Sequence, residues 1–169
     1  MITLITGGAR SGKSNHSLEL ASSYKNKVFI ATARVMDGEM EDRISKHKKE
    51  RGNAFTTIEE PLDLAAALKN LPEETDLALI DCTTVWIGNL MFERENEEEP
   101  FIEINEFIEA LISAPCDVII VSNEVGMGIV PDNAMARKFR DIAGRLNQDI
   151  AKIAAKVILT VAGMPVQLK

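Results

Sequence analysis

An eight-residue run near the start of the chain has the spacing of a phosphate-binding loop. It reads Gly7-Gly8-Ala9-Arg10-Ser11-Gly12-Lys13-Ser14 and matches G-x-x-x-x-G-K-[ST] without a gap. Glycines let the backbone curl until its N–H groups point at phosphate oxygens, and the start of a following helix adds positive potential. We expect Lys13 to reach the β- and γ-phosphates and the Ser14 hydroxyl to ligate Mg²⁺. The run therefore predicts a nucleotide site.

The residues on either side of this run provide the setting that the motif requires. Residues 1–6 are a short apolar, β-branched run typical of a buried strand, and residues 15–21 are typical of a helix. Strand, glycine-rich loop and helix in this order are the context in which the pattern binds nucleotides. The alternative is a glycine-rich turn that closes an ordinary βα unit, which would leave Lys13 without a function.

Two further polar segments follow predicted strands. Phosphate-loop enzymes hold Mg²⁺ with an acid at the end of a neighbouring strand, and Asp81 ends the apolar run 77–80. Asp81 could instead, or in addition, cap the next helix. Asn123 and Glu124 follow another apolar run, at the edge where open parallel sheets bind ligands. The alternative for this pair is a plain strand-to-helix loop.

A histidine on a predicted helix could do chemistry that phosphoryl transfer alone does not need. Met40, Ile44, His47 and Arg51 fall on one helix face at spacings of four, three and four. Neutral imidazole is a nucleophile at pH 7, and neighbouring cations keep it neutral and stabilise charge on an attacked phosphate. His47 could attack an α-phosphate, expel pyrophosphate and hold the nucleotide as a phosphoramidate. The alternative is a solvent-facing histidine without a catalytic role.

The elements that must position these residues alternate between strands and helices. Continuous apolar runs indicate strands buried on both faces, as in a parallel sheet. The alternation predicts an α/β fold, a P-loop NTPase-like three-layer domain with a mostly parallel sheet, as one domain over residues 1–169. The expected strands are Ile2–Thr6, Val28–Thr32, Leu77–Asp81, Val118–Ser122 and Val157–Val161, with a short edge strand over 166–168. The expected helices cover 13–24, 37–52, 61–70, 101–113 and 132–155.

The composition argues against several classes of protein. A chain of 169 residues that is 46% hydrophobic suits one core. A net charge of −7 and a pI near 4.9 argue against nucleic acid as a partner. No apolar run approaches the roughly 20 residues of a membrane span. Cys82 and Cys116 lack metal-ligand spacing, which predicts reduced thiols and fits a cytoplasmic protein.

Two surfaces leave alternatives open. Arg137, Arg140 and Asp141 share one face of a predicted helix, where they could form surface ion pairs or bind a phosphorylated substrate. The sequence favours surface ion pairs. The apolar strip over 85–92 could be a subunit contact or part of the core, and we favour the core.

Six segments of the chain share their residues with one known family. They are residues 5–14, 30–33, 39–47, 81–84, 122–131 and 139–148. Together they resemble the bifunctional adenosylcobinamide kinase / adenosylcobinamide-phosphate guanylyltransferase family of cobalamin biosynthesis. The resemblance runs from Met1 to Lys169, and the block over 123–148 is its most specific part.

The resemblance implies two reactions at one nucleotide site. A hydroxyl on the aminopropanol arm of adenosylcobinamide takes the γ-phosphoryl group of ATP or GTP. GTP then transfers GMP to a histidine, which matches His47, and pyrophosphate leaves. Adenosylcobinamide phosphate takes this GMP to give adenosylcobinamide-GDP. The resemblance also suggests a homotrimer that binds the corrinoid substrate in a cleft between subunits.

The resemblance assigns further residues by position. Asp81 matches the acid after the third strand, and Glu59 matches an acid near the nucleotide, with Glu60 as a neighbouring candidate. The other implied nucleotide contacts are Thr32, Ala33, Arg34, Lys48, Lys49, Glu50 and Arg51. Two other functions compete with this assignment. One is a plain small-molecule kinase without a covalent nucleotide, and the other is a non-catalytic nucleotide-binding regulator.

Overall fold

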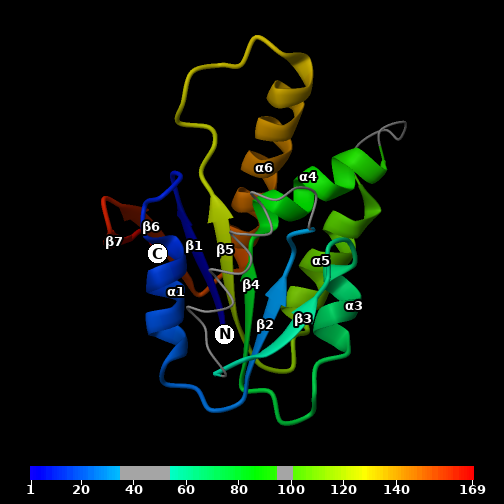
Figure 1. Ribbon diagram of the computed structural model, residues 1–169, viewed down its shortest axis with the longest axis vertical. Helices are drawn as coiled ribbons and strands as arrows, with labels where there is room; N and C mark the ends of the chain where they lie inside the picture. The colour runs from blue at the N-terminus through cyan, green and yellow to red at the C-terminus, as the bar shows by residue number, and fades with distance from the viewer. Residues whose placement is uncertain (35–53, 95–100) are drawn as a thin grey trace.

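The computed structural model describes residues 1–34, 54–94 and 101–169, and Figure 1 shows their arrangement. Seven strands form one sheet in the order β3-β2-β4-β5-β1-β6-β7. All of its pairings are parallel except that of β6 with β7. The strands are β1 (Ile2–Gly7), β2 (Lys27–Ala31), β3 (Thr56–Glu59), β4 (Leu77–Asp81), β5 (Asp117–Asn123), β6 (Lys156–Val161) and β7 (Met164–Gln167).

Five of these strands confirm the predicted ones to within one residue at each end. The expected final strand is also present, as β7, although it begins two residues earlier than predicted. Strand β3 is not among the predicted strands. Its sequence, Thr-Thr-Ile-Glu, is mostly exposed at the edge of the sheet, so it lacks the continuous apolar run that marks a buried strand.

Five helices connect the strands in the described part of the chain. They are α1 (Lys13–Ala21), α3 (Leu64–Lys69), α4 (Thr83–Glu93), α5 (Ile102–Ile112) and α6 (Ala134–Ile153). Four of them confirm predicted helices with shorter ends, and α4 begins two residues after Asp81. Asp63 and Asn133 each accept a hydrogen bond from the backbone N–H three residues later and so cap α3 and α6. The expected helix over 37–52 lies outside the described residues.

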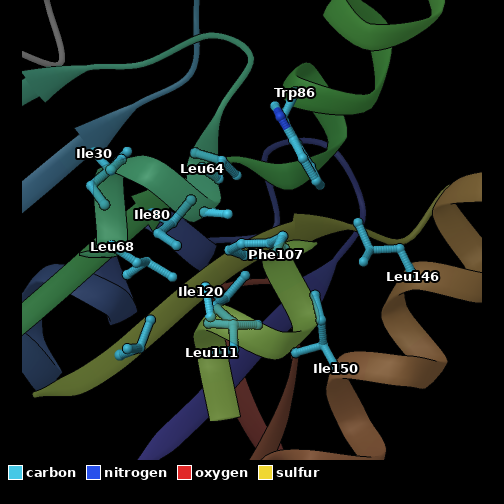
Figure 2. Packing of buried hydrophobic residues seen from close by; sticks show 14 of the residues in the cluster. Ile30, Leu64, Leu68, Ile80, Trp86, Phe107, Leu111, Ile120, Leu146 and Ile150 are labelled. Carbon is cyan, nitrogen blue, oxygen red and sulfur yellow. The ribbon is translucent and has the colours of Figure 1, made fainter. Parts of the chain in front are cut away.

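Both faces of the sheet are covered, which confirms the three-layer prediction. Alternate residues of one strand point to opposite faces, so Leu4 packs into the larger core cluster and Ile5 into the smaller one. Figure 1 shows α1 on one face and α3, α4, α5 and α6 on the other. Figure 2 shows the larger cluster. In it, the ring centroids of Trp86 and Phe107 lie 5.1 Å apart.

The apolar strip on α4 belongs mainly to this core. Trp86, Ile87 and Leu90 are fully buried, which confirms the core interpretation for these three residues, whereas Phe92 is 68% exposed. Cys82 and Cys116 are both free thiols, as expected. None of the helices in the described ranges is long and apolar enough to cross a membrane.

Candidate nucleotide site

The phosphate loop lies at the carboxyl end of β1, between two neighbouring strands, and leads directly into α1. Gly12 is the N-cap residue of α1 and has φ 100°, a left-handed conformation that glycine adopts without strain. Gly7 has φ 152°, and a Cβ at this position would lie 2.5 Å from the carbonyl oxygen of Thr160. Backbone conformation therefore requires glycine at position 12, and close packing requires it at position 7.

The Lys13 side chain folds back over the loop. Its ammonium donates to the carbonyl oxygens of Gly7, at 3.0 Å, and Gly8, at 2.6 Å. Burial lowers the pKa of Lys13, and the neighbouring acidic groups Cys82 and Asp81 would oppose this shift when ionised. The Cys82 thiol stays neutral at pH 7 because burial raises its pKa to about 12, so Asp81 is the charge that opposes the shift. An ammonium has three N–H donors, so one remains for a phosphate oxygen.

The two predicted magnesium ligands lie side by side. The Ser14 hydroxyl donates to Asp81 Oδ2 at 3.1 Å, although the residues are 67 positions apart. Adjacent ligands of octahedral Mg²⁺ lie about 3 Å apart, because each metal–oxygen bond is about 2.1 Å, so this pair fits the ion. Asp81 is not the N-cap residue of α4: that residue is Cys82, whose own side chain makes no capping hydrogen bond.

The loop after β5 lies against the phosphate loop. The Glu124 N–H donates to the Gly7 carbonyl at 2.9 Å, and one carboxylate oxygen of Glu124 accepts from the Gly126 N–H at 2.8 Å. The Asn123 N–H donates to the Thr84 hydroxyl at 2.7 Å. Asn123 and Glu124 therefore lie beside the phosphate loop, with the Glu124 carboxylate holding its own loop, and both interpretations of the pair stay open.

A second group of predicted contacts gathers where β2, β3 and β4 end. The Thr32 hydroxyl is fully buried and makes two hydrogen bonds to Cys82, donating to its carbonyl and accepting from its N–H, both at 2.9 Å. The hydroxyl therefore holds the end of β2 against the start of α4. We call residues 7–14 the phosphate-loop half of the site, and residues 32–34, 59–61 and Asp81 the strand-end half.

Two side chains of helix α4 contact the strand-end half. Asn89 is 7% exposed, and its side-chain amide donates to the carbonyls of Thr32, at 2.8 Å, and Pro61, at 3.0 Å. Arg34 donates to the Glu93 carboxylate at 2.5 Å. Sequence reasoning missed Asn89 and Glu93. A buried amide within an otherwise apolar helix is a signal that could have identified Asn89.

The structure also separates the two candidate acids at the end of β3. One oxygen of the Glu60 carboxylate accepts from the backbone N–H groups of Leu62 and Asp63, at 2.9 and 2.8 Å. Glu60 therefore shapes the turn into α3. Glu59 pairs in register with Ala31 of β2, is exposed and remains the better candidate for the nucleotide.

The charged side chains on α6 make hydrogen bonds and an ion pair at the protein surface. Arg137 donates to the backbone carbonyls of Pro131, at 2.9 Å, and Asp132, at 2.6 Å, and so closes the loop before the helix. Arg140 and Asp141 form an ion pair at 3.5 Å. These contacts favour the surface role over a phosphate-binding role for this face.

Comparison with known proteins identifies the family to which this chain belongs. Residues 3–168 match the family model described as cobinamide kinase / cobinamide phosphate guanyltransferase. The chain belongs to this family. Family membership confirms the resemblance noted from the six sequence segments and makes the chain a transferase of this bifunctional class.

Full-length relatives support the same family. The chain is 39% identical to the bifunctional adenosylcobalamin biosynthesis protein CobU of Escherichia coli (strain K12), covering 100% of both chains. It is 42% identical to the protein of the same name from Salmonella typhimurium, again over 100% of both. It is also 42% identical to CobP of Pseudomonas aeruginosa, over 100% of this chain and 98% of the relative.

Solved structures confirm the fold class of this family member. The chain resembles an ATPase of the type III secretion system with a TM-score of 0.60 and 10% identity, over 98% of this chain and 56% of the other. It resembles the RadB recombinase with a TM-score of 0.53 and 14% identity, over 94% and 73% of the two chains. At these identities the likeness shows the P-loop NTPase-like fold alone.

Part of the predicted site of this kinase/guanyltransferase lies outside the described residues. His47, Lys48, Lys49, Glu50 and Arg51 all fall within 35–53, between β2 and β3. Their roles therefore stay predictions from the family resemblance. The structure brings together the phosphate loop, Thr32 to Arg34, Glu59 and Asp81 around the carboxyl ends of β1, β2, β3 and β4.

Proposed function

We propose that the protein catalyses two successive reactions on a corrinoid. It phosphorylates adenosylcobinamide with ATP or GTP, and it then transfers GMP from GTP, through His47, to adenosylcobinamide phosphate. The products of the second step are adenosylcobinamide-GDP and pyrophosphate. The observation that carries the proposal is the arrangement of Lys13, Ser14 and Asp81 around a phosphate loop, in a chain of the cobinamide kinase / guanyltransferase family.

In the first reaction, the chain's own residues mainly position phosphates and stabilise charge. The aminopropanol hydroxyl oxygen attacks the γ-phosphorus, the bond to the β–γ bridging oxygen breaks, and the hydroxyl proton is lost to water. Lys13 neutralises charge on the transferred group. Ser14 and Asp81 would hold Mg²⁺, which supplies charge neutralisation between the β- and γ-phosphates. In the described residues no cluster of three His, Cys, Asp or Glu side chains could hold a metal.

In the second reaction, a histidine nitrogen attacks the α-phosphorus of GTP. The bond to the α–β bridging oxygen breaks, pyrophosphate leaves, and GMP remains on His47 through a phosphorus–nitrogen bond. A phosphate oxygen of adenosylcobinamide phosphate then attacks the same phosphorus, and the histidine leaves. The strand-end half, with Arg34 and Glu59, supports this step because it flanks the segment that carries His47.

We further propose that the protein works in the cytoplasm as a homotrimer, with the corrinoid between subunits. Exposed apolar side chains on the loop before α6 support a contact with another molecule. They are Met127, Ile129 and Val130, which are 79%, 97% and 61% exposed. Sedimentation equilibrium of the purified protein should give a mass about three times that of the chain, and a monomer would overturn this part.

The covalent step is tested with GTP labelled at the α-phosphate. The protein is incubated with Mg²⁺ and labelled GTP, denatured and separated from free nucleotide. We expect label on the chain that is acid-labile, alkali-stable and absent from His47→Ala. A matched control is His16→Ala, since His16 lies on α1 outside the predicted guanylyl contacts and its variant should keep the label.

The competing hypothesis of a plain kinase makes the opposite prediction for this experiment. A plain small-molecule kinase would transfer the γ-phosphoryl group to adenosylcobinamide and leave no α-label on folded protein. Absence of label, with phosphoryl transfer intact, would overturn the guanylyl-histidine step. Absence of both reactions in a protein that still binds nucleotide would favour the regulator.

A further inference from the structure

The C-terminal hairpin, formed by β6 and β7 with the turn at Ala162 and Gly163, lies against the phosphate loop. Figure 1 shows the red hairpin beside the start of α1, at the end of the sheet where β1 runs into the loop. The two segments are about 150 residues apart in the sequence. The hairpin contains none of the residues that the phosphate-loop pattern or the family resemblance marks.

Two hydrogen bonds join the hairpin to the loop, and a third joins it to Thr6, the residue before the loop. The hydroxyls of Ser11 and Thr160 are hydrogen-bonded at 2.7 Å in a buried position, and the Thr160 hydroxyl also donates to the Thr6 carbonyl at 3.3 Å. The Gly163 N–H donates to the Ser11 carbonyl at 2.9 Å. Ser11 is therefore held at both its side chain and its backbone.

The packing at this contact leaves no spare room. A Cβ at Gly7 would lie 2.6 Å from the Thr160 hydroxyl as well as 2.5 Å from its carbonyl oxygen. A Cβ at Gly12 would lie 3.0 Å from the Cα of Gly163. The first and last glycines of the loop thus both touch the hairpin, and the loop cannot shift toward it.

We propose that Thr160, together with the turn at Gly163, is a positioning element of the nucleotide site. A phosphate loop binds through backbone N–H groups whose directions depend on the loop's conformation. Thr160 acts through Ser11, since it fixes the middle of the loop from outside while Lys13 and Ser14 face the phosphates. The hairpin therefore keeps the loop ready for phosphates, which lowers the ordering that nucleotide binding requires.

The inference rests on the proposed nucleotide chemistry, and Thr160→Val tests it because valine keeps the shape and removes the hydroxyl. We expect the dissociation constants for ATP and GTP to rise about five-fold, the effect of one lost buried hydrogen bond. We expect KM for nucleotide to rise by a similar factor in both reactions while kcat changes less. Thr160→Ser keeps a hydroxyl and should restore wild-type affinity.

A double-mutant cycle with Ser11→Ala separates positioning from general destabilisation. Because both variants remove the same bond, the double variant should bind nucleotide no more weakly than the weaker single variant. The control is Tyr24→Phe, which removes a hydroxyl bond of 2.6 Å to Asp117 at the opposite end of the sheet. Tyr24→Phe should lower thermal stability and leave nucleotide affinity unchanged.

Two results would overturn the inference: wild-type nucleotide affinity in folded Thr160→Val, or multiplicative losses in the double variant. If Thr160→Val does not fold, the Ser11→Ala variant removes the same hydrogen bond from its other partner. The Thr160→Ser variant, which keeps the bond, is then the control. Nucleotide affinity is measured without the corrinoid. Failure of either reaction in the wild-type protein would therefore count against the proposed function and not against the role of Thr160.

Discussion

The two halves of the site are held by different kinds of contact. The phosphate-loop half is held by backbone packing so close that glycine is required at Gly7, with hydroxyls and N–H groups of the hairpin around it. The strand-end half is held by side chains of α4, above all the Asn89 amide, which reaches two carbonyls at once. The phosphate-loop half therefore depends on close backbone packing. The strand-end half depends on a few side-chain hydrogen bonds that single substitutions can remove.

This difference has a consequence for the two proposed reactions. Both reactions need the phosphate loop, so damage to the phosphate-loop half should reduce both by similar factors. The strand-end half flanks residues 35–53, which carry the predicted nucleophile. Apart from Asp81, which we assign to Mg²⁺ in both reactions, damage there should reduce guanylyl transfer more than phosphoryl transfer.

The largest effect is expected from Gly7→Ala. The added Cβ would meet the Thr160 carbonyl at 2.5 Å, so the loop and β6 must move apart. We expect a loss of about 1–3 kcal/mol in the free energy of unfolding and a fall in both reactions of about ten-fold or more. Thermal unfolding and the rates of the two reactions measure these effects.

The matched control is Gly88→Ala in α4, where an added Cβ meets no atom within 4 Å. It should stabilise the protein by about 0.5–1 kcal/mol, because alanine favours a helix over glycine, and it should leave both reactions unchanged. Equal losses from the two variants would show that the close contact at Gly7 does not matter.

An intermediate effect is expected from Asn89→Ala. The change leaves the Thr32 and Pro61 carbonyls without their amide donor in a buried position, at a cost of about 1–3 kcal/mol in unfolding free energy. We expect α-label transfer from GTP to fall several-fold more than γ-phosphoryl transfer from ATP. Rates of the two reactions, measured on the same preparation, give this ratio.

Asn105→Ala is the control for this variant, since Asn105 is exposed on α5. It should change neither the ratio nor the stability. A ratio that stays at the wild-type value in Asn89→Ala would remove the distinction between the two halves.

The smallest effect concerns a contact that belongs to neither half. Tyr24 is the only tyrosine of the chain, and its hydrogen bond to Asp117 raises its pKa to about 12. Because the folded pKa lies above the unfolded value of about 10, its stabilisation is complete below about pH 10 and is lost between about pH 10 and 12. Tyrosinate absorbance at 295 nm should titrate near pH 12, and nearer pH 10 in Asp117→Asn. An ordinary midpoint in the wild-type protein would contradict the contact, and nucleotide affinity should not change in Asp117→Asn.

Most of the fold could be predicted from local patterns. Strand β4 matches its predicted bounds at both ends, because its residues form a continuous apolar run that ends in a charged one. Strand β3 could not be predicted this way. It is a short, mostly exposed strand that exists because β2 offers it a free edge, and that edge is a property of the assembled sheet.

The site residues also divide into those whose contacts the sequence predicts and those whose contacts it does not. Ser14 and Asp81 could be paired from sequence, because the phosphate-loop pattern names one and the end of a neighbouring strand names the other. The Thr32 hydroxyl makes two hydrogen bonds to Cys82, which the sequence did not predict, and the expected nucleotide contact of this residue stays a prediction. A pattern of residue types identifies the residue but does not show which partner takes its hydrogen bonds.

The sequence by itself determined the phosphate loop, the alternation of strands and helices and the family, because these depend on neighbours within a few residues or on residue identity along the chain. The tertiary structure alone decided how the loop and the strand ends are held. Thr160 meets Ser11 across 149 positions, and Asn89 reaches Thr32 across 57. Such contacts depend on strand order, which brings β6 beside β1 and places β4, the strand that leads into α4, beside β2, and no local pattern records that order.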